Sequence, residues 1–256
     1  MKNKISLLVM VLLVVPQFTF AQLKAIEYKD GIDNLAGYFG KAKGKLLDNA
    51  GVLILPAWMG IDDHSKESAI ELNALGYHAF VADIYGIGNK PNSPQEAGKI
   101  SGSYKKDIQN YHRRIQLALD QLIKNGANPE KIVVIGYCFG GTGAIEAARI
   151  NMKVKGIVSF HGGLARDSSR TITPITPKVL VLHGADDPYE SELEIKDFQN
   201  EMRTAKADWQ MNYYSNAVHA FTHKDAGNDN SKGVAYNKEA AERSWKAMLT
   251  FFKEIL

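Results

Sequence analysis

The sequence predicts a single α/β domain with a mostly parallel, doubly wound sheet that is flanked by helices. Short apolar runs alternate along the chain with segments of helical periodicity. The run 51–60 is apolar throughout, and 179–182 is a second such run, as in strands buried on both faces of a parallel sheet. No internal repeat, long charge run or proline-rich linker divides residues 22–256, which suffice for one large domain.

Strands and helices can be placed from local patterns. Strands are expected where β-prone runs end in turn residues, at 23–28, 35–42, 51–55, 78–83, 132–135, 155–160, 178–184 and 209–214, the first two antiparallel. Helices are expected from apolar periodicity and capping residues, at 62–75, 104–124, the alanine-rich segment ending at 149, 191–204 and 234–255. The stretch 86–103 is rich in Gly, Pro, Ser and Asn, and is expected to be a surface loop or lid.

Residues 1–21 have the pattern of a signal peptide. Lys2 and Lys4 precede the apolar run 5–15, and Thr19-Phe20-Ala21 places small residues where a signal peptidase cleaves, before Gln22. The apolar run is shorter than the ~20 residues that span a bilayer, so no stable membrane anchor is expected. The mature domain, 22–256, is therefore expected to be exported to a periplasm or to the extracellular space.

Composition excludes several function classes. The chain has 31 basic and 28 acidic residues, and loss of the two lysines in the leader leaves a net charge of about +1. This balance does not favour nucleic acid or an anionic membrane as a partner. The sequence contains no dinucleotide-binding glycine motif, Walker lysine or zinc-ligand pattern, so neither a cofactor nor a metal is expected. The single cysteine excludes an internal disulfide.

That cysteine, Cys138, lies in a strand–turn–helix pattern. The β-prone run 132–135 leads into Gly136-Tyr-Cys138-Phe-Gly140-Gly141, and a helix-forming segment follows. A Gly-x-nucleophile-x-Gly turn holds its central side chain at the carboxyl end of a strand and at the start of a helix. The field of that helix end favours a thiolate. We interpret Cys138 as a nucleophile, with a small buried hydrophobic residue as the alternative.

Two later strand ends carry groups that can activate a thiol. Asp186 and Asp187 follow the strand at 178–184, and His219 follows the last strand. Because the carboxyl ends of parallel strands meet at one edge of a sheet, His219 is a candidate base and Asp187 its orienting group. One of the two aspartates is expected to serve the turn before Pro188 only.

The chain resembles the dienelactone hydrolase family. The motifs that carry the resemblance span about residues 25–255, namely Gly136-Tyr-Cys-Phe-Gly-Gly141, His183-Gly-Ala-Asp-Asp-Pro188, Tyr214-Ser-Asn-Ala-Val-His-Ala-Phe-Thr222, Asp83-Ile-Tyr-Gly86 and the closing 233–245. The resemblance implies an α/β-hydrolase fold and a Cys138–His219–Asp187 triad, because the family's acid stands three positions after the strand glycine. It also implies an oxyanion hole formed by the backbone N–H groups of Trp58 and Phe139.

The implied activity is hydrolysis of a small ester or lactone without a cofactor or metal. The sequence departs from the family's lactone-cleaving members at three positions. Those members have a glutamate where this chain has Ala57, and arginines where it has Ile87 and His223. A pocket more aromatic and less cationic is therefore expected, with contributions from Trp58, Met59, Tyr85, Phe139, His161 and His223, of which Tyr85, His161 and His223 are candidate substrate contacts.

Two alternatives stay open on the sequence. The same triad could hydrolyse a thioester or a peptide-like acyl bond, and a binding protein could retain the scaffold with an inert Cys138. Oligomeric state cannot be inferred from these patterns.

Overall fold

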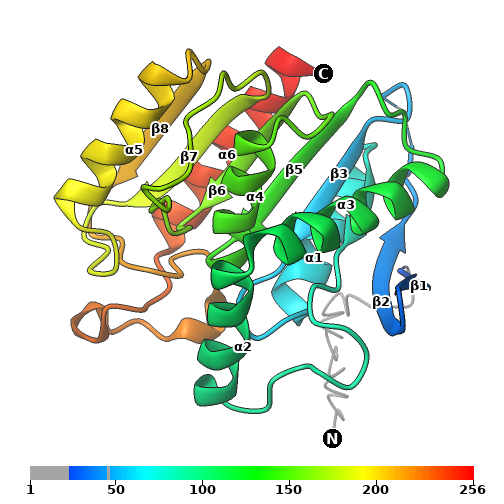
Figure 1. Ribbon diagram of the computed structural model, residues 1–256, viewed down its shortest axis with the longest axis horizontal. Coiled ribbons are helices and arrows are strands. Elements are labelled where there is room, and N and C mark those ends of the chain that lie inside the picture. The colour runs from blue at the N-terminus through cyan, green and yellow to red at the C-terminus, as the bar shows by residue number, and fades with distance from the viewer. Residues whose placement is uncertain (1–22, 45–46) are drawn as a thin grey trace, which may run out of the picture.

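The computed structural model describes residues 23–44 and 47–256, and these form one eight-stranded sheet with helices on both faces (Figure 1). The expected signal peptide lies outside the described residues. The strands are β1 Lys24–Asp30, β2 Asp33–Gly40, β3 Gly51–Leu55, β4 His78–Val81, β5 Ile132–Tyr137, β6 Gly156–Phe160, β7 Lys178–Gly184 and β8 Trp209–Tyr214. The α-helices are α1 Asp63–Ala74, α2 Pro94–Lys106, α3 Ile108–Lys124, α4 Phe139–Arg149, α5 Glu192–Thr204 and α6 Lys238–Ile255. The predicted α/β class and single-sheet architecture are confirmed.

The sheet has the strand order β1-β2-β4-β3-β5-β6-β7-β8. The six strands from β4 to β8 in this order run parallel, while β1 and β2 form an antiparallel hairpin that joins the sheet beside β4. The chain builds outward from β3 in both directions, so the strand order reverses near β3 and β5. Ligands of doubly wound sheets bind at the carboxyl edge near such a reversal, and Cys138 directly follows β5.

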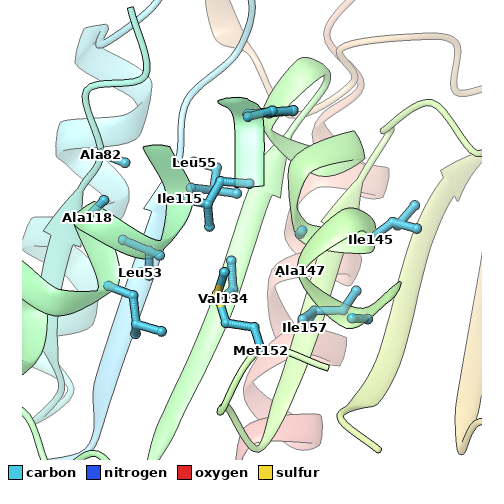
Figure 2. Packing of buried hydrophobic residues seen from close by; sticks show 14 of the residues in the cluster. Leu53, Leu55, Ala82, Ile115, Ala118, Val134, Ile145, Ala147, Met152 and Ile157 are labelled. Atoms are coloured by element: carbon cyan, nitrogen blue, oxygen red, sulfur yellow. The ribbon is translucent and has the colours of Figure 1, made fainter. Parts of the chain in front are cut away.

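The sheet separates two hydrophobic cores. One core lies under α3, α4 and α5 and contains Val134, Leu53 and Ile157 from the sheet (Figure 2). The other lies under α1 and α6, and it takes the alternate residues Val133 and Ile135 of β5. Successive β5 side chains therefore point into different cores, which explains why this strand is an uninterrupted apolar run.

The stretch 86–103 is partly helical, which corrects the expectation of a loop or lid. Ser93 caps α2 by accepting a hydrogen bond from the Glu96 N–H at 3.2 Å, and Pro94 occupies the first turn. The helix expected over 104–124 is in fact two helices. Asp107 has φ −96° and ψ 71°, a non-helical conformation, and its carboxylate caps α3 at the Asn110 N–H.

The last helix begins at Lys238, four residues later than expected, because Val234 pairs with His219 in an isolated parallel bridge. Asn237 caps this helix at the Ala240 N–H. Among the described residues, no helix combines the length and apolar character that a membrane crossing requires.

Candidate active site

The turn between β5 and α4 places Cys138 in a strained backbone conformation. Cys138 has φ 53° and ψ −114°, a region that L-residues rarely occupy. The flanking glycines are required by main-chain contacts. A Cβ on Gly136 would lie 1.9 Å from the Gly140 carbonyl oxygen, and a Cβ on Gly140 would lie 2.0 Å from that of Leu55. Both positions therefore require a residue without a side chain.

Hydrogen bonds from the main chain of Cys138 hold this turn. The Cys138 N–H lies 3.0 Å from the Phe160 carbonyl oxygen and 3.2 Å from His161 Nδ1. Because Nδ1 accepts, the His161 proton is on Nε2, which donates to Thr222 Oγ1 at 2.8 Å. His161 is fully buried and has φ 39°, so a second strained residue supports the first.

His219 and Asp187 lie beside Cys138. His219 Nδ1 is 2.8 Å from Asp187 Oδ2, and the other imidazole nitrogen forms a hydrogen bond with the Cys138 thiol. The Asp187 side chain is fully buried, and its Oδ1 accepts the Tyr189 N–H at 3.0 Å. Asp186 is exposed at the turn. The structure thus brings together the three residues that the sequence singled out, and it places Asp187, not Asp186, against the histidine.

The charges of this group favour an ion pair. Burial alone lowers the pKa of His219, but hydrogen bonds with Asp187 and Cys138 outweigh burial and raise it to about 10. Burial alone raises the pKa of the Cys138 thiol, but the His219 hydrogen bond and the Phe139 N–H bring it below its ordinary value. Both pKa shifts are in the direction that favours a thiolate beside an imidazolium.

Cys138 and His219 open into a cavity of about 510 Å³. Ala57, Trp58 and Phe139 lie on its wall with His223. The remaining lining residues come from α2, α4 and the loops after β6, β7 and β8, and they are Ser101, Lys105, Thr142, Gly163, Tyr189, Glu190, Ala220, Asp225, Ala226 and Val234.

A model of the dienelactone hydrolase family matches residues 35–256. The chain belongs to the dienelactone hydrolase family. Membership makes it an ester or lactone hydrolase of the dienelactone hydrolase type, in agreement with the resemblance found in the sequence.

Individual relatives cover most of the chain. The solved structure of a dienelactone hydrolase-like promiscuous phosphotriesterase, P91, from metagenomic libraries is 38% identical, has a TM-score of 0.84, and covers 91% of this chain and 98% of its own. A probable 2-oxo-3-(5-oxofuran-2-ylidene)propanoate lactonase of Bradyrhizobium is 26% identical over 79% of this chain and 82% of its own. An uncharacterized protein of Caenorhabditis elegans is 31% identical over 49% of this chain and 80% of its own.

Three of the residues expected in the pocket lie elsewhere. Tyr85 is 4% exposed, stacks on Phe139 at 5.9 Å between ring centroids, and donates its hydroxyl to the Trp58 carbonyl at 2.8 Å. His161 is fully buried because its positive φ turns the ring toward Thr222. Met59 is absent from the cavity lining. Tyr85 and His161 therefore support the cavity wall, and their expected role as substrate contacts is corrected.

The departures from the family pattern can now be located. Ala57 lines the cavity of this dienelactone hydrolase family member beside Trp58, as expected. Ile87 is 53% exposed and lies outside the cavity lining, whereas His223 lies within it. The aromatic wall is present, but Lys105 on α2 adds a cation that the sequence reading missed. The residues Ser93, Pro94 and Glu96 form a helix N-terminal capping pattern, from which α2 could have been predicted. The spacing of apolar residues along α2 would then have indicated which face of the helix carries Lys105.

His64 is a second residue that sequence reasoning missed. Its ring lies 4.2 Å from that of His223 and 4.5 Å from that of Tyr137, between centroids. Burial lowers the pKa of both histidines, so this layer behind the cavity is neutral. Within the parts of the chain that the structure describes, no group of three or more His, Cys, Asp or Glu side chains is placed to hold a metal ion.

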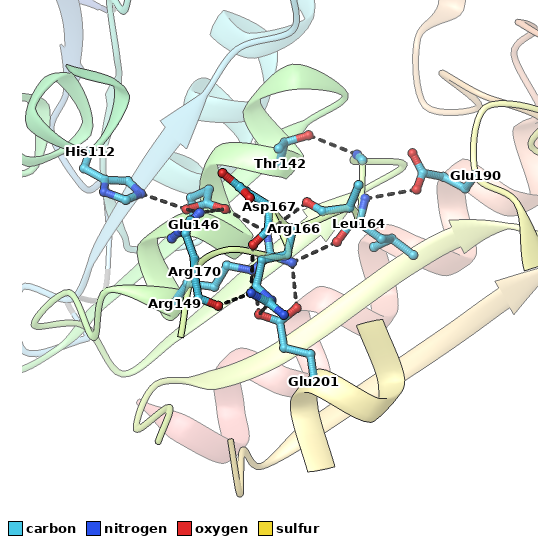
Figure 3. Close-up of polar contacts among 12 residues, drawn as sticks. His112, Thr142, Glu146, Arg149, Leu164, Arg166, Asp167, Arg170, Glu190 and Glu201 are labelled. Carbon is cyan, nitrogen blue, oxygen red and sulfur yellow. Dashed lines mark hydrogen bonds and ion pairs between the residues drawn. The ribbon is translucent and has the colours of Figure 1, made fainter. Parts of the chain in front are cut away.

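Helix α4 is anchored by a buried ionic network (Figure 3). Glu146 contacts His112 at 2.8 Å, Arg149 at 2.8 Å and Arg170 at 2.9 Å. Arg149 also bonds Glu201 of α5 through two nitrogens, at 2.9 and 2.8 Å. The network ties the helix that begins at the nucleophile turn to α3, α5 and the 164–170 loop. It was not visible in the sequence, because its members are spread over about ninety positions of chain.

Proposed function

We propose that this protein hydrolyses carboxylic esters or lactones through a Cys138–His219–Asp187 triad and a thioester intermediate. The observation that carries the proposal is the continuous hydrogen-bonded chain from Asp187 through His219 to Cys138 at the edge of the cavity. The depressed thiol pKa supports a nucleophilic role over that of an inert buried thiol.

Each step follows from the positions of these groups. The Cys138 thiolate attacks the substrate carbonyl carbon, and the carbonyl oxygen takes up the negative charge. The Phe139 N–H donates to the Cys138 sulfur, and Trp58 lines the same cavity, so the N–H groups of these two residues are the proposed oxyanion hole. The Tyr85 hydroxyl fixes the Trp58 peptide from behind.

Collapse of the tetrahedral intermediate breaks the carbon–oxygen bond of the ester. His219, protonated in the ion pair, gives its proton to the leaving alkoxide, and the acyl group stays on Cys138 as a thioester. The neutral His219 then takes a proton from water, and the resulting hydroxide attacks the thioester. Release of the acid restores the thiolate and the imidazolium. Asp187 holds the imidazole ring through Nδ1 in both halves of the reaction.

The test is hydrolysis of p-nitrophenyl acetate and butyrate by the protein and by Cys138→Ala and His219→Ala. We expect activity in the parent and loss of at least about 10³-fold in kcat for each variant. Far-UV circular dichroism checks that both variants fold. Activity indifferent to Cys138 would refute the triad, and saturable ligand binding without turnover would favour a binding protein on this scaffold. A thioester substrate assayed in parallel tests the alternative acyl specificity.

A second candidate activity is hydrolysis of phosphotriesters. The 38% identical phosphotriesterase structure favours it, since it covers 91% of this chain. Attack of the Cys138 thiolate on phosphorus would expel an aryloxide and leave an S-phosphoryl enzyme, which water activated by His219 would resolve. Paraoxon distinguishes the outcomes. Sustained p-nitrophenolate release that depends on Cys138 supports turnover, whereas a single stoichiometric burst shows inhibition only.

We also propose that residues 1–21 direct export and are removed. The support is the order of charged, apolar and small residues in the sequence. Mass spectrometry of the protein from fractionated cells tests the proposal. A mature amino terminus at Gln22 in the exported fraction agrees with it, and an intact amino terminus in the cytosolic fraction contradicts it.

A further inference from the structure

Three polar side chains from three different elements converge on one point of the cavity, beside Gly163. A Cβ placed on Gly163 would lie 3.0 Å from Thr142 Oγ1, 3.4 Å from Glu190 Oε1 and 4.0 Å from Lys105 Nζ. The glycine carries only hydrogen here, and it lines the cavity with all three residues. The space that a side chain at 163 would fill is therefore bordered, within 4.0 Å, by a hydroxyl, a carboxyl and an ammonium group.

Thr142 and Glu190 each accept one hydrogen bond from a backbone N–H, and each retains one further donor or acceptor that a ligand can use. Thr142 Oγ1 accepts the Gly163 N–H at 3.0 Å, which leaves the hydroxyl proton to donate. Glu190 Oε2 accepts the Leu164 N–H at 3.0 Å, which leaves Oε1 facing the point. Among the described residues, no carboxylate lies within ion-pair distance of Lys105 Nζ. Figure 3 shows the contact of Thr142 and the contact between Glu190 and Leu164.

The chemistry of the three groups selects what can occupy the point. Lys105 only donates hydrogen bonds, and the free oxygen of Glu190 accepts them when ionised. Burial raises the pKa of the Glu190 carboxyl to about 7, so this side chain is mainly ionised above that pH. There a carboxylate ligand would meet the negative Glu190 oxygen and an ammonium ligand would meet Lys105, so each charged group faces one like charge. An uncharged group that both accepts and donates, such as a hydroxyl or a carboxamide, satisfies both neighbours at once.

The distance from Cys138 defines where on the substrate this group sits. Thr142 follows Cys138 by one helical turn, and its N–H bonds the Cys138 carbonyl at 3.0 Å. Both residues line the same cavity, so the group bound beside Gly163 belongs to a substituent a few bonds from the reacting carbonyl carbon.

We propose that Lys105, Thr142 and Glu190 form a subsite for an uncharged hydroxyl or carboxamide substituent of the ester or lactone substrate. The inference rests on the proposed function and specifies its substrate class. The apolar wall of Trp58 and Phe139 would hold the hydrocarbon part of the same molecule.

The test compares p-nitrophenyl 3-hydroxybutyrate with p-nitrophenyl butyrate, which differ only in the hydroxyl. We expect kcat/KM for the hydroxy ester to be about tenfold higher, the size of one or two net hydrogen bonds to a charged or polar site. p-Nitrophenyl pentanoate controls for bulk. Monomethyl succinate against methyl butyrate, followed by titration of released acid, tests for an anion site.

Variants assign the preference to the subsite. Gly163→Ala fills the point with a methyl group, and Lys105→Met and Glu190→Met each remove one partner. All three variants should bring the hydroxybutyrate-to-butyrate ratio close to one. Lys106→Met is the matched control, because Lys106 is the exposed neighbour of Lys105 on α2 and is not in the cavity lining. It should leave the ratio unchanged.

Each contrary outcome has a distinct meaning. Hydrolysis that depends on Cys138 but shows a ratio near one in the parent protein overturns the subsite and leaves the triad intact. An equal gain with pentanoate, or a gain with monomethyl succinate larger than that with the hydroxy ester, also overturns it. Absence of any hydrolysis that depends on Cys138 overturns the proposed function itself.

Discussion

The buried carboxylate of Glu146 should make the free energy of unfolding fall at acidic pH, and the substitution Glu146→Gln should remove this contribution. Glu146 accepts from His112, Arg149 and Arg170, and its side chain is 3% exposed. Burial alone raises the pKa of Glu146, but these partners outweigh it and hold the pKa at about 2, against 4.5 for the ordinary group. Since the folded-state pKa is depressed, the stabilisation is complete above pH 4.5 and is lost as pH falls toward 2.

The magnitude follows from the two pKa values. A depression from 4.5 to about 2 contributes about 3 kcal/mol to the free energy of unfolding at pH 6. At pH 3.5 the unfolded chain has mostly bound the proton and the folded protein has not, so about 2 kcal/mol remains. The loss between the two pH values is therefore about 1 kcal/mol from this single group.

The assay is urea unfolding of the parent and of Glu146→Gln at pH 6 and pH 3.5. The stability difference between the two proteins should shrink by about 1 kcal/mol at the lower pH, since the glutamine side chain of the variant does not titrate. Glu242→Gln is the control, because Glu242 is exposed on α6 with a partner, Lys238, at 3.9 Å. A difference that stays constant between the two pH values would refute the depressed pKa and with it the strength of the network.

Four further changes test the site and its support. Alkylation of Cys138 by iodoacetamide should stay fast below pH 8.5, because its lowered pKa keeps the thiolate populated, and the rate should fall only at lower pH. Asp187→Asn should lower kcat by about 10³-fold with little change in KM, since the ring loses its anionic partner. Gly140→Ala should cost about 1–3 kcal/mol of stability in a thermal melt, because its Cβ would overlap the Leu55 carbonyl. His161→Leu should lower kcat about tenfold, and His161→Asn should recover most of it by restoring an acceptor for the Cys138 N–H.

Control variants and contrary results decide how these four outcomes are interpreted. Gly102→Ala on α2 has no atom within 4 Å of the added Cβ and should be neutral or stabilising, unlike Gly140→Ala. Alkylation that requires unfolding would show that Cys138 is inert. If His161→Asn is no better than His161→Leu in kcat, the histidine acts through packing and not through its hydrogen bond to the main chain of Cys138.

The sequence was sufficient for the frame of the sheet and for the turn at Cys138. Strands such as β3 and β5 are apolar on both faces, and Gly136 and Gly140 leave little choice of turn. The relation of Asp187 to His219 could also be inferred, because the carboxyl ends of parallel strands meet at one edge. These features depend on chain order and local pattern alone.

Side-chain direction could not be inferred in the same way. Tyr85 and His161 stand at strand ends, as the triad residues do, yet both face inward. For His161 the reason is a positive φ, a backbone conformation that the presence of a histidine in the sequence does not predict. Lys105 was missed because the break at Asp107 separates α2 from α3, and the break depends on a cap, not on the apolar pattern. The convergence at Gly163 likewise requires three elements to be placed together first.

The separation of the two cores by the sheet has a consequence for how the chain is made. The core under α3, α4 and α5 is complete once the chain has been synthesised through β8, because Trp209 and Met211 pack against it. The opposite core needs Met248, Phe251 and Phe252 of α6, in addition to α1, to cover β5 and its neighbours. Part of that face of the sheet therefore stays uncovered until α6 has been synthesised, and a ribosome that stalls before α6 would leave an apolar, aggregation-prone surface exposed.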